Sequence, residues 1–400
     1  MRSALLALCV LSFATPLTAQ RLGPEEKRPK LAAGADTNDA GSYLSLGMRS
    51  LADRTDEAAA AFYWAARLDP SSPDALDGRR AALLMRRPST LNNYMEGGRK
   101  AQESKEFKAI DSLQLRARRL DPLYYRKNDA AMLMTYYRRS MRRAYPTAGD
   151  HEINLAIVDY LERGSAYMRG WLAYSRGDMM GALEHYDMAL KAAKNKGGIR
   201  VERGRIFALR GTLPPAIAEF RLALEDLRKD EDKKDENVIF YSSKAMVEHS
   251  MGVLYAKLGQ ADSAKTVLGR AIAEDLSYFA AHLELGSLAL AEKDTAAAVS
   301  AFGLASELAT DEPYVHFLYG STLVAAGQHA DALGPLKRAI ELESVFAAPH
   351  FSLGQALERT GDPAGARTAY TTFLALASRR DSRRDAATRR IEALAKPAAP

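Results

Sequence analysis

The sequence contains almost no cysteine. The single cysteine among its 400 residues, Cys9, lies in the apolar stretch that opens the chain. If this stretch is removed as a leader, the remaining chain has no thiol and forms no disulfide. Asn-x-Ser/Thr sequons are also absent, so the sequence is silent on glycosylation.

Apolar runs long enough to cross a bilayer are lacking too. The apolar run at residues 4–13 is too short for a membrane span, but it follows the charged Arg2 and precedes small residues. Residues 1–19 therefore resemble a secretory signal peptide, with cleavage expected after Ala19 or, alternatively, after Ala14. We expect an exported bacterial protein, periplasmic or secreted.

The common catalytic signatures do not occur. The sequence has no HExxH, no GxSxG, no phosphate-binding glycine loop and no paired-cysteine metal motif. We therefore expect no enzyme, no catalytic residue, no cofactor and no bound metal.

A period of 34 residues dominates the second half of the sequence. It is marked by four glycines, each followed 12 residues later by an alanine and 16 residues later by a large apolar residue: Gly252, Gly286, Gly320 and Gly354; Ala264, Ala298, Ala332 and Ala366; Leu268, Phe302, Leu336 and Tyr370. Small residues let two helices approach closely, and the large ones fill the space beside them. Such a period predicts stacked helical hairpins.

The joints between the helices support this prediction. Glycines expected to end the first helix of a hairpin in the left-handed conformation are Gly177, Gly211, Gly259, Gly327 and Gly361. Residues expected to cap the next helix are Asp178, Thr212, Asp294 and Asp362.

On these residues the chain resembles the tetratricopeptide repeat (TPR) family. Two further copies surround Gly170 and Gly204, and weaker ones lie near Gly47 and Gly98. The motif's first position is never tryptophan here. The resemblance implies an all-α fold, a right-handed α-solenoid closed by a C-terminal capping helix over residues 381–395.

The period and the composition divide the chain into eight segments. They are a signal peptide (1–19), a loose linker (20–38), divergent TPR-like repeats (39–124), a divergent basic helical segment (125–162), two repeats (163–228), a charged insert (229–244), four repeats (245–378) and a capping helix with tail (379–400). Residues 91–124 are expected to form one repeat by themselves. The charged insert is either an exposed loop or a solvated extension of the helix before it.

Charge is distributed unevenly along the chain. Residues 91–150 carry 13 basic and 7 acidic side chains, a balance of +6, whereas residues 245–378 carry 8 basic and 15 acidic ones, a balance of −7. The tail, 379–400, carries 7 basic and 3 acidic side chains, a balance of +4. An acidic array favours a basic partner.

The resemblance also implies a binding groove on the inner face of the superhelix. The matching positions are mostly aromatic or apolar: Tyr167, Trp171, Tyr174, Met246, His249, Val253, Leu283, Tyr314, Phe317 and Phe351. The Lys and Asn clamp for a peptide carboxylate, known in some TPR domains, has no counterpart here. Such a groove suits an amphipathic helix or an apolar peptide. Equally, the chain's own insert or tail fills it, or its residues pack within the superhelix.

Two further clusters have competing interpretations. Arg138, Arg139, Arg142 and Arg143 share one helix face, which suits an anionic membrane or cell-wall polymer, or is simply a solvated face. His282, His316 and His350 repeat with the period. They lie too far apart to share one metal ion, so we expect each to pack between repeats.

The sequence therefore predicts a protein-binding scaffold of the bacterial envelope. Its partner is a protein or peptide, with a basic one favoured, and not a nucleic acid. The alternative is a factor that docks on anionic lipid or polymer through residues 116–145. The sequence does not determine the oligomeric state.

Overall fold

The structure is a computed structural model that describes residues 21–96, 104–230 and 243–395. These residues form 20 α-helices and no strand, which confirms the predicted all-α fold. In this part of the chain no helix is both long and apolar enough to span a membrane. The predicted signal peptide with Cys9, most of the charged insert and the last five residues lie outside the described residues.

Twelve helices in the second half form six hairpins of the predicted solenoid. They are α10 (Ala166–Ser175), α11 (Met179–Ala192), α12 (Gly197–Leu209), α13 (Leu213–Asp230), α14 (Lys244–Lys257), α15 (Ala261–Glu274), α16 (Phe279–Ala291), α17 (Thr295–Leu308), α18 (Pro313–Ala325), α19 (His329–Leu342), α20 (Ala347–Arg359) and α21 (Pro363–Leu376). The helix α22 (Arg384–Ala395) packs against α21 as the expected cap.

The periodic glycines lie where the two helices of a hairpin cross. A Cβ atom at Gly286 would lie 2.7 Å from the ring of Phe302, and one at Gly354 would lie 2.6 Å from the ring of Tyr370. Both rings are buried. Only glycine leaves room for these rings, so the period is a packing requirement.

The turns inside the hairpins also follow the sequence. The five predicted cap glycines all have positive φ, for example 70° at Gly259 and 77° at Gly327. At the equivalent turn between α16 and α17 the residue is Lys293, with a φ of 63°. Asp178, Asp294 and Asp362 cap the following helices as predicted, whereas the Thr212 hydroxyl donates to the Phe207 carbonyl.

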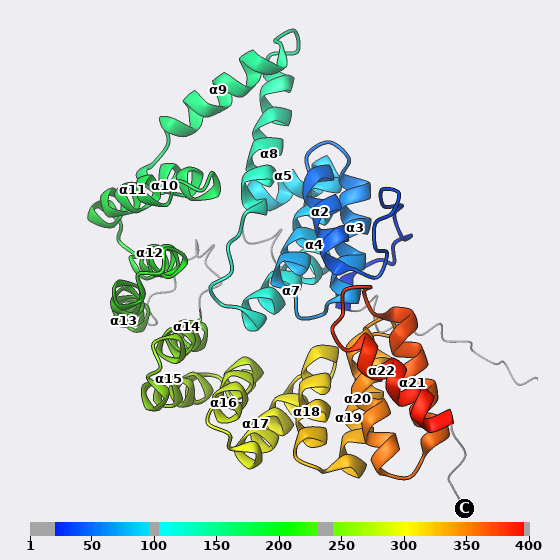
Figure 1. Ribbon diagram of the computed structural model, residues 1–400. Helices are drawn as coiled ribbons and strands as arrows, with labels where there is room; N and C mark the ends of the chain where they lie inside the picture. Colours follow the sequence, from blue (N-terminus) through cyan, green and yellow to red (C-terminus); the bar gives the residue numbers. More distant parts are fainter. Residues whose placement is uncertain (1–20, 97–103, 231–242, 396–400) are drawn as a thin grey trace, which may run out of the picture.

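The first half is helical but less regular. Its helices are α2 (Ala40–Ser50), α3 (Thr55–Leu68), α4 (Pro73–Arg86), α5 (Pro88–Glu96), α7 (Lys105–Leu120), α8 (Asn128–Ala144) and α9 (Asp150–Glu162). The expectation that residues 91–124 form a repeat by themselves is wrong. The main partner of α7 is α4, which lies before this range, and α5 is inserted between the two in sequence. The α8–α9 hairpin projects from the rest of the molecule (Figure 1).

Residues 21–38 correct the prediction of a loose linker. Leu22 is fully buried, and the buried Arg79 donates to the carbonyls of Leu22 (3.2 Å) and Pro24 (2.8 Å). Arg79 also pairs with Glu26 at 2.9 Å, and the Trp64 indole donates to the Glu26 carbonyl at 3.0 Å. The composition suggested mobility, but these backbone groups are held by side chains about 40–60 residues away.

The beginning and the end of the described chain meet, at residues 36–38 and 375–379. Figure 1 shows the array curving from α10 to α21, with the N-terminal helices beside α21 and α22. The Asp36 carboxylate accepts hydrogen bonds from the Ser378 hydroxyl (2.9 Å) and the Arg379 backbone (2.6 Å). The Asn38 amide donates to the Ala375 carbonyl at 2.7 Å. The solenoid is therefore closed by its own first half.

Candidate functional site

The ten residues predicted to line the groove lie on the inner helices, but none of them is exposed. Tyr174, Met246, His249 and Leu283 are buried, and the other six are half-buried. The chain's own first half contacts part of this face, in place of the insert or the tail that the sequence left open as occupants.

The connector between α7 and α8, residues 121–127, covers the first part of this face. The Tyr125 hydroxyl donates to the Tyr174 carbonyl at 2.9 Å, and the Arg126 backbone donates to the Tyr174 hydroxyl at 3.2 Å. The Arg126 guanidinium pairs with Glu202 of α12 at 2.7 Å. Tyr167 and Trp171 pack in the same cluster as Tyr125 and Tyr174. An extended segment of this chain thus lies where an external peptide was expected.

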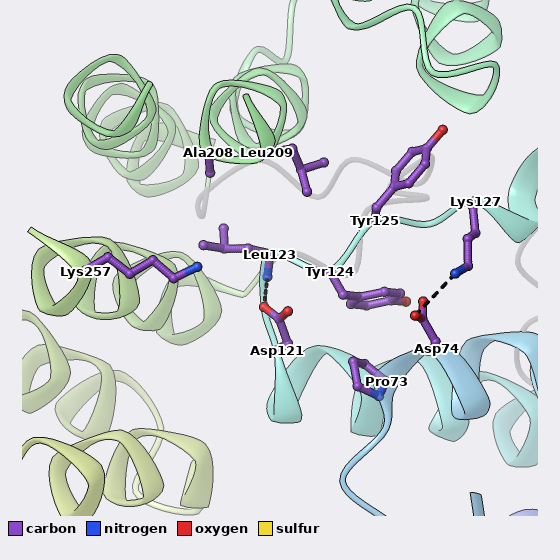
Figure 2. Close-up of a pocket in the computed structure, with 10 residues that line it drawn as sticks. All are labelled: Pro73, Asp74, Asp121, Leu123, Tyr124, Tyr125, Lys127, Ala208, Leu209 and Lys257. Atoms are coloured by element: carbon purple, nitrogen blue, oxygen red, sulfur yellow. Dashed lines mark hydrogen bonds and ion pairs between the residues drawn. The ribbon is translucent and has the colours of Figure 1, made fainter. Parts of the chain in front are cut away.

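A small hollow of about 280 Å³ remains beside the connector. Figure 2 shows it between the connector, α4, α12 and the end of α14. Its lining residues are Pro73, Asp74, Asp121, Leu123, Tyr124, Tyr125, Lys127, Ala208, Leu209 and Lys257. Lys127 already pairs with Asp74 at 3.3 Å, and Asp121 accepts from the Leu123 backbone at 2.8 Å. Its charged groups are partly engaged within the chain.

The arginines at the end of α7 cover the next part of the face. Arg118 contacts the sulfur of Met246 at 3.8 Å, and the Arg119 guanidinium lies 5.4 Å from the ring centre of Phe279. Burial, together with the nearby charges of Arg205 and Arg126, lowers the pKa of Arg118 to about 10. His249 is enclosed behind this contact, with Nδ1 3.1 Å from the Tyr278 hydroxyl.

The aromatic residues of the last repeats form two separate sets of ring contacts. Phe317 lies 5.3 Å from Phe346, and Phe351 lies 5.2 Å from Phe373, measured between ring centres. The Arg383 guanidinium lies 5.9 Å from the centre of the Phe351 ring. The Phe351 ring therefore packs on the buried Phe373, and it also lies near Arg383, the residue directly before α22.

A larger hollow than the one beside the connector lies on the last two repeats and remains open. Its volume is about 580 Å³, within the usual range for ligand sites. It is lined from α18, α20, α21 and α22, and by the first residue of α19: Ser321, Val324, Ala325, His329, Phe351, Ser352, Gln355, Glu358, Arg359, Tyr370, Ala386 and Arg390. We call this site the terminal hollow.

Polar groups at the terminal hollow are held in place. Glu358 accepts from the Tyr370 hydroxyl at 3.2 Å and from Arg390 of α22 at 3.0 Å. Burial raises the pKa of Tyr370 to about 12, so its hydroxyl remains a donor. Of the predicted groove residues only Phe351 lines this site. The contribution of α22 was missed because the motif does not specify how a cap packs on the last hairpin.

The basic cluster on α8 is largely engaged within the protein. Arg138 donates to the Asn154 side chain (3.2 Å) and Arg139 to the Met85 carbonyl (2.9 Å), while Arg142 pairs with Asp150. Arg142 and Arg143 are exposed. Docking on lipid or polymer stays a prediction that these contacts do not favour.

The periodic histidines occupy equivalent places in three repeats. His316 and His350 are buried and His282 is half-buried, and burial lowers the pKa of all three. His316 Nε2 lies 3.2 Å from the Thr310 carbonyl. Across residues 21–96, 104–230 and 243–395, no group of three or more His, Cys, Asp or Glu side chains is arranged to hold a metal ion.

Comparison with known proteins agrees with this architecture. A tetratricopeptide repeat family model matches residues 167–232, 250–313 and 318–382. This chain is a tetratricopeptide repeat protein, of the class whose repeats bind other proteins. No curated protein sequence matches the chain.

Solved structures of other proteins resemble parts of it. YrrB, a TPR protein with an unusual peptide-binding site, is 16% identical, with a TM-score of 0.40 over 51% of this chain and 97% of that one. MamA is 20% identical, with a TM-score of 0.37 over 45% and 90%. The C-terminal part of a TPR protein from Cytophaga hutchinsonii is 14% identical, with a TM-score of 0.44 over 57% and 95%.

Proposed function

We propose that this chain is a non-catalytic scaffold of the bacterial envelope that binds an extended segment of a partner protein in the terminal hollow. The observation that carries the proposal is the hollow itself, which is open, has a volume of about 580 Å³ and lies on the inner helices of the last two repeats. At Tyr174 and Met246 the predicted groove is contacted by the chain's own first half.

The lining of the terminal hollow suits a peptide. Phe351 and Val324 offer apolar contact for one side chain, while Ser321 and Gln355 offer hydrogen bonds to a peptide backbone. The ion pair between Arg390 and Glu358 keeps α22 at the edge of the site. A peptide bound here contacts two repeats and the cap at once.

The location in the envelope rests on the first 19 residues. Cleavage after Ala19 would start the mature chain at Gln20, directly before the buried Arg21. Fractionation of cells and N-terminal sequencing of the purified protein test this location. Recovery from the cytoplasm with Met1 retained would contradict it.

Photo-crosslinking in living cells tests the site. We would place p-benzoylphenylalanine at Gln355, inside the hollow, and in a matched control at Leu304, which is 46% exposed on α17. A partner should form an adduct at Gln355 and not at Leu304. The purified partner should then bind the native protein, and Gln355→Arg, which fills the hollow, should weaken binding about tenfold or more.

Two results would contradict the site. One is equal adducts at both positions, and the other is native affinity in Gln355→Arg.

A further inference from the structure

The charge asymmetry of the sequence has a counterpart inside the molecule. The basic stretch 91–150 carries a balance of +6 and the repeats at 245–378 a balance of −7. In the fold α7, which belongs to the basic stretch, and the start of the described chain contact successive repeats of the array. The acidic array therefore already has a basic partner, which is the first half of its own chain.

The contacts form a row, in which each repeat start meets at least one arginine. Arg118 contacts Met246 of α14, Arg119 lies over Phe279 of α16, and Arg116 pairs with Glu312, the residue before α18. Two arginines meet the start of the last repeat. Arg21 (2.7 Å) and Arg67 (2.9 Å) both pair with Glu343, which lies in the turn between α19 and α20. We call these contacts the arginine row.

The arginine row is shielded from water. The Glu343 side chain has no exposed surface, and the side chains of Arg21 and Arg67 are 3% and 11% exposed. The Arg116 guanidinium also donates to the Arg21 carbonyl at 2.7 Å, so the contacts at the last two repeat starts are linked. Removing one member of such a set leaves a buried charge without its partner, which is costly.

Apolar contact between the two halves is limited along the arginine row. The clusters around Phe62 and Tyr63 contain no residue of the array. Apolar contact between the halves is concentrated at α10 instead, where Leu172 joins the cluster of α8 and α9 and Tyr125 packs against the cluster of Tyr174. The main cluster of the array includes only Leu123, with Leu115 packed beside it, from residues 21–96 and 104–162. Ionic and polar contacts therefore contribute much of the specific attachment along the row. Because these pairs are buried, salt screens them strongly only after a substitution admits water.

We propose that the first half is a releasable internal ligand of the array. The arginine row holds it in the closed state, and release uncovers the starts of α14, α16, α18 and α20. An arginine-bearing helix of a partner competes with α7 for these same starts. The inference does not depend on the terminal hollow, because its test involves no binding there.

Distance measurements between the chain ends test the release. Spin labels at Ala33→Cys and Ser382→Cys, both exposed, flank the junction of the ends, and a Cys9→Ser background leaves no other thiol. The native chain should give one short distance in 50 mM salt. In Arg21→Gln/Arg116→Gln a longer distance should appear and should grow between 50 and 500 mM salt. Arg338→Gln, which breaks an exposed pair with Glu341, is the matched control and should stay closed.

A peptide of this chain, residues 112–127, tests the competition. Labelled with a fluorophore, it should bind the double variant at least tenfold more tightly than the native chain, because in the native chain α7 already covers the repeat starts. The same peptide with Gln in place of Arg116, Arg118 and Arg119 should not bind.

Two results would overturn the proposal: an unchanged short distance in the double variant, or equal peptide binding by both proteins. If circular dichroism shows that the double variant has lost its helices, the milder variant Arg67→Gln, at the most exposed arginine paired with Glu343, decides, and a single short distance in that variant then refutes release.

Discussion

Replacing Gly286 with alanine tests whether the 34-residue period is set by close packing. Its added Cβ would lie 2.7 Å from the ring of Phe302, closer than atoms in proteins pack. Phe302 is 1% exposed and sits in the main core cluster, so its ring cannot simply swing away.

The magnitude follows from two opposing effects. Alanine favours a helix over glycine by about 1 kcal/mol, whereas forcing one extra carbon into a packed core costs about 1–3 kcal/mol. Gly286→Ala should therefore lower the free energy of unfolding by up to about 2 kcal/mol. Gly269, within α15, is the matched control, because its Cβ would meet nothing within 4 Å. Gly269→Ala should raise the free energy of unfolding by up to about 1 kcal/mol.

Urea unfolding followed by circular dichroism measures both variants under one condition. The two substitutions should shift the midpoint in opposite directions. If Gly286→Ala stabilises the chain as much as Gly269→Ala does, the ring yields freely, and close packing does not explain the glycine period.

Three further predictions concern other parts of the fold. Lys293→Gly should stabilise the protein by about 0.5–1 kcal/mol. The left-handed backbone costs lysine about 1–2 kcal/mol, and the larger backbone entropy that glycine loses on folding offsets part of the gain. Urea midpoints check this, and a destabilised variant would refute it. Burial lowers the pKa of His316 and His350. At and below about pH 6.5 the unfolded chain therefore binds more protons at these residues than the folded chain does. The free energy of unfolding should accordingly fall as pH drops from 7.5 to 5.5. His316→Gln should reduce that slope, and an identical slope would exclude His316 as a source. Arg79→Met should release the segment around Leu22 and Pro24 and lower the free energy of unfolding by about 3 kcal/mol. Trypsin should then cleave the chain within residues 27–30 faster, and unchanged cleavage would contradict this.

The repeats could be predicted because their signals are local. Gly286 and Phe302 stand 16 residues apart and meet within one hairpin, so the sequence period reports their contact directly. The turn glycines are equally local, and Gly259 and Gly327 have the predicted backbone conformation.

Closure of the array could not be predicted in the same way. Arg21 and Glu343 stand 322 residues apart, and neither belongs to a motif. The composition of residues 21–38 resembles that of a linker, yet Arg79 and Trp64 order them through backbone carbonyls. The uneven charge was the one visible sign, and it was interpreted as a preference for an external partner.

The terminal hollow was predicted only in part. Phe351 was expected on the inner face because it follows the repeat. Arg390 was not, because it comes from α22, which lies outside the period.

Joined ends also bear on how such a protein can change in evolution. An open solenoid can gain or lose a unit, since each unit touches only its neighbours. Here a duplicated or deleted hairpin would displace Glu343 and Arg379 from Arg21 and Asp36 by at least one helix diameter, about 8–10 Å. The number of units is therefore fixed by geometry, and relatives that keep these pairings should differ in loop length rather than in repeat count.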